Sequence, residues 1–257
     1  MIKIFILTII IIPILTIANI LIVDDDGSNG GYYADVKEYY NYAISQNHYQ
    51  YDYYEVPYNA QGPDINILNK YTTVIWFTGQ TFGSGYCVTL SPADENNLKI
   101  YLSNGKNLML VSQDYLSDRY PGAGSFCAGQ FPYDILQIRS VIANHWTNPP
   151  QAWGASGSIA QGMTFSVSNP YKTPGRIQPD LLNHVAISLI YNTSQNSGPS
   201  SLQYNSGIYK IIFMTMAFEG FNDEAKRKEF MRRALEFFGE QNDIETNSIG
   251  MIRAVLR

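Results

Sequence analysis

Three consecutive aspartates, Asp24, Asp25 and Asp26, directly follow the apolar run of residues 20–23. Adjacent carboxylates repel one another, so they lower stability unless a cation, backbone amides or hydroxyl groups compensate them. The sequence therefore leaves two interpretations open. The aspartates are either ligands of a Ca²⁺ or Mg²⁺ ion, the only cofactors indicated, or caps of the helix that follows, where free amides and the helix dipole favour negative charge.

Polar residues also follow three other apolar runs, which end at residues 77, 111 and 216. In open α/β sheets, ligands bind outside the carboxyl ends of the strands. The sequence therefore predicts a ligand pocket at this edge. Its candidate residues are Thr78, Gly79, Gln80, Ser112, Gln113, Asp114 and Glu219.

Nucleophilic catalysis would need a positioned base beside a serine or a cysteine. Ser112 is the candidate serine, but His48, His145 and His184 all lie in segments that we do not expect at its turn. The two cysteines, Cys87 and Cys127, have no local sequence support for a nucleophilic role. In an exported chain, an even pair of cysteines indicates a disulfide, which here would tie two neighbouring loops.

Short apolar runs alternate with amphipathic segments along most of the chain, which is typical of a parallel sheet covered by helices. The clearest helix start is at Ser91, with Pro92 next and Asp94 three residues on, close to a capping box. Asn222 and Gly239 are expected to cap and to end the last helix. The expected strands are residues 19–23, 51–56, 73–77, 107–111 and 209–216, and the expected helices are 32–47, 65–70, the helix from Ser91 to Gly105, and 223–238.

A length of 257 residues with 45% hydrophobic content fits one domain, residues 19–239. Residues 114–206 are rich in turn residues around short alternating stretches, at 163–167 and 186–191, and are read as a β-rich insertion. Residues 240–257 are expected to form a linker or a short terminal strand. The predicted fold class is α/β: a three-layer sandwich around a mostly parallel sheet, flavodoxin-like or amidotransferase-like.

The first 18 residues have the pattern of a cleaved secretory signal: Lys3, an apolar stretch at 4–15, and the small residues Thr16 and Ala18. An uncleaved anchor is the alternative, because the apolar run continues to Val23, although Pro13 interrupts it. We expect a secreted, periplasmic or cell-surface protein. A net charge of −5 and a single basic run, at 226–233, exclude a nucleic-acid footprint.

Residues 20–26, ILIVDDD, resemble the start of response-regulator receiver domains, but no phosphoacceptor aspartate follows residue 77. A longer resemblance is to the class I glutamine amidotransferase-like fold of exported bacterial proteins. Its features are residues 23–27, VIWFTG at 74–79, the Ser91 helix, LMLVSQDY at 108–115 and the late Phe218–Glu219 pair.

The resemblance implies a cysteine on the turn after residue 111 and a histidine beside the late glutamate. Gln113 occupies the expected nucleophile position, and Glu219 has no adjacent histidine. The first hypothesis is therefore an exported, noncatalytic binding or accessory module. It would contact a secreted or cell-surface partner, otherwise unknown, through the strand-end pocket or the tyrosine-rich face of residues 32–58. The alternatives are a secreted hydrolase that uses Ser112 or a metal-bound water, and a structural cell-surface protein.

Overall fold

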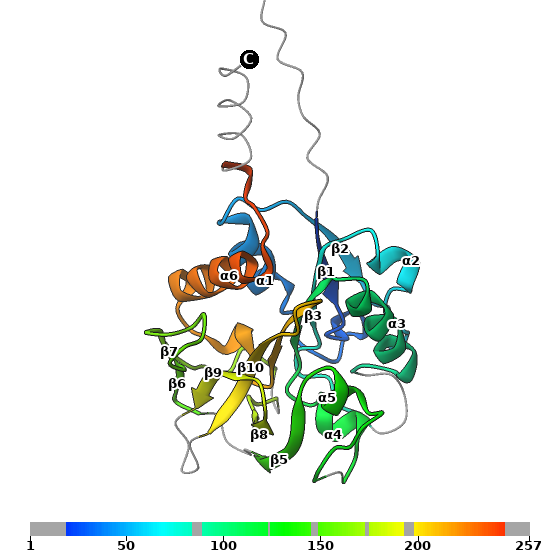
Figure 1. Ribbon diagram of the computed structural model, residues 1–257. Coiled ribbons are helices and arrows are strands. Elements are labelled where there is room, and N and C mark those ends of the chain that lie inside the picture. Colours follow the sequence, from blue (N-terminus) through cyan, green and yellow to red (C-terminus); the bar gives the residue numbers. More distant parts are fainter. Residues whose placement is uncertain are drawn as a thin grey trace, which may run out of the picture.

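The computed structural model describes residues 19–83, 89–122, 124–144, 149–172, 175–192 and 198–244. Its centre is a nine-stranded sheet in the order β2-β1-β3-β4-β11-β10-β9-β6-β7, and β5 and β8 form a second, two-stranded sheet (Figure 1). The strands of the main sheet are β1 (Ile20–Asp24), β2 (Tyr51–Glu55), β3 (Thr73–Phe77), β4 (Asn107–Val111), β6 (Gln151–Gly154), β7 (Thr164–Ser166), β9 (Ile187–Asn192), β10 (Pro199–Asn205) and β11 (Lys210–Met214).

The first five strands of that order are all parallel. Counted along the chain, they have the order 2-1-3-4-5, which is the doubly wound, flavodoxin-like arrangement. The α/β class with a large, partly parallel central sheet is therefore confirmed. The predicted bounds of β3 and β4 are also confirmed, because each is a run of four apolar residues after one polar residue, lies inside the sheet and ends at polar turn residues.

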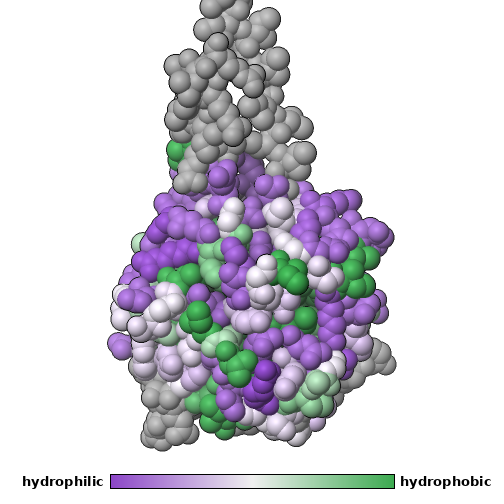
Figure 2. Space-filling model, viewed as in Figure 1, coloured by the Kyte–Doolittle hydropathy of each residue, from purple (hydrophilic) through white to green (hydrophobic). Residues whose placement is uncertain are grey.

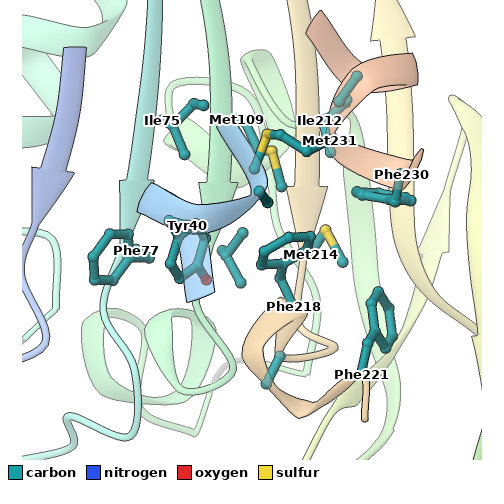
Figure 3. Packing of buried hydrophobic residues seen from close by; sticks show 14 of the residues in the cluster. Tyr40, Ile75, Phe77, Met109, Ile212, Met214, Phe218, Phe221, Phe230 and Met231 are labelled. Carbon is teal, nitrogen blue, oxygen red and sulfur yellow. The ribbon is translucent and has the colours of Figure 1, made fainter. Parts of the chain in front are cut away.

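Side chains alternate between the two faces of the parallel strands, and helices cover both faces. One face packs under α1 (Lys37–Ser45) and α6 (Glu224–Phe238), and the other under α2 (Ile65–Leu68), α3 (Pro92–Ser103), α4 (Tyr115–Arg119) and α5 (Phe131–Asp134). Figure 3 shows the first face, where Tyr40 of α1 stacks on Phe77 with ring centroids 4.0 Å apart. This packing fixes α1 over the carboxyl ends of β1 and β3.

The region predicted as a β-rich insertion is built differently. Strands β6, β7, β9 and β10 join the main sheet through antiparallel pairs beyond β11. Only β5 (Ile138–Asn144) and β8 (Asp180–His184) pair apart from it. The β-rich insertion is therefore not confirmed: the region does contain strands, but most of them extend the central sheet, because β11 offers them an open edge to pair with.

Helix ends follow the expected chemistry with one shift. Ser91 and Asp94 form a reciprocal capping box at the start of α3. Asp223, rather than the predicted Asn222, caps α6 by accepting from the Lys226 amide at 3.1 Å. Gly239 ends α6 in the left-handed conformation, with φ 93°.

Two further predictions fall partly outside the described residues. Cys127 is exposed and free in the structure, whereas Cys87 lies outside the described residues, so the disulfide stays a prediction. The same holds for the signal segment 1–18 and for residues 245–257 of the tail. Within the part of the chain that is described, no helix is both long and apolar enough to cross a membrane.

Candidate functional site

The structure brings the predicted pocket residues to one edge of the sheet. They follow the carboxyl ends of β1, β3 and β4, and Glu219 lies in the 3₁₀ helix Phe218–Gly220 just beyond β11. Most of these side chains are buried, among them Thr78, Ser112, Gln113 and Glu219. The edge is therefore a packed polar layer, in which the hydrogen-bond partners of each side chain determine its role.

Asp26 organises the loop between β1 and α1. One carboxylate oxygen accepts the Ser28 amide at 2.8 Å, and the other accepts the Val36 amide at 2.8 Å. Val36 is the residue that precedes the first turn of α1. The aspartate thus holds the start of that helix, as the capping interpretation expects.

Asp24 and Asp25 point to different partners. Asp24 accepts the Asp26 amide at 3.2 Å and the hydroxyl of Tyr53 on β2. Burial and the charge of Asp26 together raise the pKa of Asp24 to about 7. Asp25 instead accepts the indole N–H of Trp76 at 3.0 Å, in the core of the opposite face. Burial raises the pKa of Asp25 well above its usual range.

The three aspartates therefore do not form one metal site, since Asp25 faces away. Asp35 replaces it: Asp24, Asp26 and Asp35 each place an oxygen within 4.8 Å of the others. Carboxylate oxygens in such a group suit Ca²⁺ or Mg²⁺, and each oxygen has a second lone pair free for a cation. The residues fit such an ion, although their hydrogen bonds explain their positions without one.

Within the described residues, Ser112 has no histidine partner of the kind that a catalytic serine needs. Its hydroxyl lies 2.7 Å from the hydroxyl of Thr78, and both residues are buried. His184 lies on β8 and contacts Ser188 at 3.3 Å, and His48 lies just after α1. His145 falls outside the described residues. No described histidine is thus hydrogen-bonded to Ser112.

Gln113 uses its amide group at both ends. Its Nε2 donates to the Arg176 carbonyl at 3.0 Å and to Asp114 Oδ2 at 3.1 Å, and its Oε1 accepts the Gln178 amide at 3.1 Å. The side chain therefore ties the turn after β4 to the backbone of residues 176–178. A Gln in the expected nucleophile position serves here as a structural bridge.

A second buried carboxyl group lies near Asp114. Asp180 is the first residue of β8, and its backbone carbonyl accepts the Thr215 hydroxyl at 2.7 Å. Burial raises the pKa of Asp114 to about 7, and burial together with the charge of Asp114 raises the pKa of Asp180 to about 8. No sequence pattern pointed to Asp180, because a lone Asp before an apolar strand is usually exposed.

Glu219 is a further buried carboxyl group of the edge. It accepts the hydroxyl of Tyr40 at 2.7 Å and that of Tyr171 at 2.6 Å. Burial raises its pKa, and the two phenols partly offset that rise by stabilising the charge. Tyr40 and Tyr171 were not predicted as site residues, since they come from segments about 130 residues apart.

Gly79 and Gln80 complete the predicted set. Gly79 has φ 56°, and a Cβ on it would lie 3.0 Å from the Asp26 side chain, so the turn needs glycine. The Gln80 Oε1 atom is buried and has no hydrogen-bond partner in the described part of the chain. None of the ion pairs between described residues includes Asp24, Asp114, Asp180 or Glu219.

Comparisons with known proteins bear on the fold. No protein-family description and no curated protein sequence matches the chain. Among solved structures, the chain is similar to the cytoplasmic protein STM3548 from Salmonella typhimurium, with a TM-score of 0.56 and 11% identity over 85% of this chain and 98% of that one. It is also similar to a ThuA-like protein from Bacteroides uniformis, with a TM-score of 0.53 and 10% identity over 87% of this chain and 91% of that one.

A third similar structure is a β-galactosidase from Bacillus circulans sp. alkalophilus, with a TM-score of 0.58 and 11% identity over 87% of this chain. The chain spans only 31% of the length of this and other β-galactosidases that it matches. At such identities the likeness concerns the fold alone. That fold is coarsely the class I glutamine amidotransferase-like one of the ThuA-like proteins, as the sequence features indicated.

Proposed function

We propose that the chain is a noncatalytic binding module built on an amidotransferase-like fold and exported from the cell. The observation that carries the proposal is the state of Gln113. Both ends of its amide are engaged by the turn after β4 and by residues 176–178. A group so engaged has no free atom in the place where an enzyme of this fold would present its nucleophile.

The neighbouring polar groups support the same conclusion. Ser112 pairs with Thr78, and Glu219 pairs with two buried phenols. Catalytic groups need access to substrate, whereas Ser112, Thr78 and Glu219 are at most 2% exposed. Buried polar groups that satisfy one another rigidify a fold.

Export is proposed on the sequence of residues 1–18. Cleavage after Ala18 would remove none of β1, which begins at Ile20. Amino-terminal sequencing of the protein recovered from the culture medium or periplasm tests this. A first residue of Asn19 supports export with cleavage, and an intact Met1 in the cytoplasm contradicts it.

The absence of catalysis is tested by incubating the purified chain with L-glutamine, aryl esters and an aryl β-galactoside, in parallel with Ser112→Ala. We expect no turnover above the buffer rate for either protein. Turnover that Ser112→Ala abolishes, in a variant with the wild-type circular dichroism spectrum, would contradict the proposal and favour a serine hydrolase.

A metal-assisted hydrolase is the second candidate, and the close approach of Asp24, Asp26 and Asp35 favours it. The test is a calorimetric titration with Ca²⁺ and with Mg²⁺, repeated on the double variant Asp24→Asn/Asp26→Asn. Heat that the double variant loses would support a metal site. No heat from wild type leaves loop organisation as the role of these aspartates.

A further inference from the structure

Exposed aromatic rings gather beside the loop that follows β1. Tyr32 is 68% exposed, Phe82 55% and Tyr58 44%, and all three residues lie near Tyr33, which is buried. We call Tyr32, Tyr33, Tyr58 and Phe82 the aromatic rim. Single exposed apolar residues are ordinary, and Figure 2 shows them dispersed among hydrophilic ones on the face in view. Three exposed rings near a fourth call for an explanation.

Contacts with neighbouring groups restrict the three tyrosine rings of the rim. The Tyr33 hydroxyl donates to the Phe82 carbonyl at 2.9 Å, and the Tyr32 and Tyr33 rings meet edge to face with centroids 5.1 Å apart. The Tyr58 ring lies so close to Gly30 that a Cβ there would be 2.7 Å from it. A surface with such fixed rings loses little conformational entropy when it binds a ligand.

The rim also lies where this fold binds ligands. Residues 27–33 follow β1, and Phe82 follows β3, so the rim stands outside the carboxyl ends of two neighbouring strands. In the strand order 2-1-3-4-5, the connections leave β1 and β3 in opposite directions, and ligands bind at this switch point. Among the described residues of this edge, Thr78, Ser112, Gln113 and Glu219 are buried, whereas Tyr32, Tyr58 and Phe82 of the rim are exposed.

The charges near the rim restrict the ligand. Lys37 is paired with Asp35 at 2.8 Å, and Lys172 donates to the Tyr33 carbonyl at 3.1 Å. The Lys37–Asp35 pair is neutral, and Asp118, which accepts the Gly83 amide at 3.4 Å next to Phe82, offsets the charge of Lys172, so the described surroundings of the rim carry no net positive charge to attract an anionic ligand. Three rings are also few for a protein interface, which buries about 800 Å² on each partner.

A neutral carbohydrate meets these conditions. One face of a pyranose ring carries C–H groups that stack on aromatic rings, and its hydroxyl groups bond to phenols, carbonyls and carboxylates. We propose that the aromatic rim binds a neutral saccharide chain, with Tyr32 and Phe82 as its stacking surfaces. This inference rests on the proposed function, since it names the ligand class of the noncatalytic module.

Affinity electrophoresis of the full chain in gels that contain soluble galactomannan, xyloglucan, galactan or mixed-linkage β-glucan tests the inference. We expect at least one polysaccharide to retard wild type, and Tyr32→Ala or Phe82→Ala to weaken binding about tenfold. Tyr42→Ala is the matched control, because Tyr42 is an exposed tyrosine on α1 outside the rim. Thermal unfolding verifies that each variant folds.

Two results would overturn the inference: no retardation by any of these polysaccharides, or equal retardation of wild type and both rim variants. Release of reducing ends from a polysaccharide that wild type binds is a separate outcome. It would contradict the noncatalytic function and leave the rim as the saccharide-binding surface.

Discussion

The carboxyl group of Asp180 should make the protein less stable as pH rises. The side chain is 4% exposed, and no hydrogen bond to its carboxylate is recorded among the described residues. Burial, with the charge of Asp114, raises its pKa to about 8, against 3.8 for an exposed aspartate. The folded protein therefore holds a proton on Asp180 that the unfolded chain releases above pH 4.

The sign and size of the effect follow from proton linkage. A group with a raised pKa stabilises the fold fully below its unfolded pKa, and that stability is lost as pH rises through the folded pKa. Across the window from pH 4 to 8, one extra proton in the folded state lowers the free energy of unfolding by about 1.4 kcal/mol per pH unit. Between pH 5 and pH 7 the loss from this one group is about 3 kcal/mol.

Asp180→Asn keeps the shape of the side chain and removes its titration. From pH 5 to pH 7, the free energy of unfolding of wild type should fall by about 3 kcal/mol relative to that of the variant. The assay is urea unfolding at pH 5, 6, 7 and 8, followed by the fluorescence of the buried Trp76. Glu38→Gln, a change of an exposed carboxylate on α1, should keep the wild-type dependence. Equal pH slopes for Asp180→Asn and wild type would refute the reasoning.

Three further variants test the local structure. Ser91→Ala removes the acceptor of the Asp94 amide and should lower the free energy of unfolding by about 1 kcal/mol, measured by urea unfolding. Gly239→Ala places a Cβ at φ 93° and should lower the melting temperature through a cost of about 1 kcal/mol; an unchanged melting temperature would contradict the left-handed cap. Tyr171→Phe removes one donor from buried Glu219 and should cost about 1–3 kcal/mol near neutral pH, with a smaller cost under acidic conditions where the carboxyl group is protonated.

Local patterns predicted the parallel part of the fold well. The strands at residues 73–77 and 107–111 were fixed by uniform burial, and the Ser91 helix by a cap that needs only neighbouring residues. The helix expected from Tyr32 begins only at Lys37, because Asp26 holds the Val36 amide across the loop. That bond depends on the folded loop, so no sequence period reveals it.

The antiparallel half and the polar layer were harder to predict. Short alternating stretches mark strands but not their partners, so the pairing of β10 with β11 could not be read from them. The structure places the predicted pocket residues at one edge, because parallel strands end together, while the pocket itself stays a prediction. Their partners were missed: Asp180 and Tyr171 come from irregular or antiparallel segments, and burial is what makes them notable.

The free energy of unfolding of Gln113→Ala tests the central claim most directly, because structural and catalytic roles predict opposite signs. If Gln113 bridges the turn after β4 to residues 176–178, its loss removes the partly buried hydrogen bonds to the Arg176 carbonyl and from the Gln178 amide, and stability should fall by about 1–3 kcal/mol. If this edge were instead strained for catalysis, the replacement should leave stability unchanged or raise it. A rise in the free energy of unfolding would contradict the account.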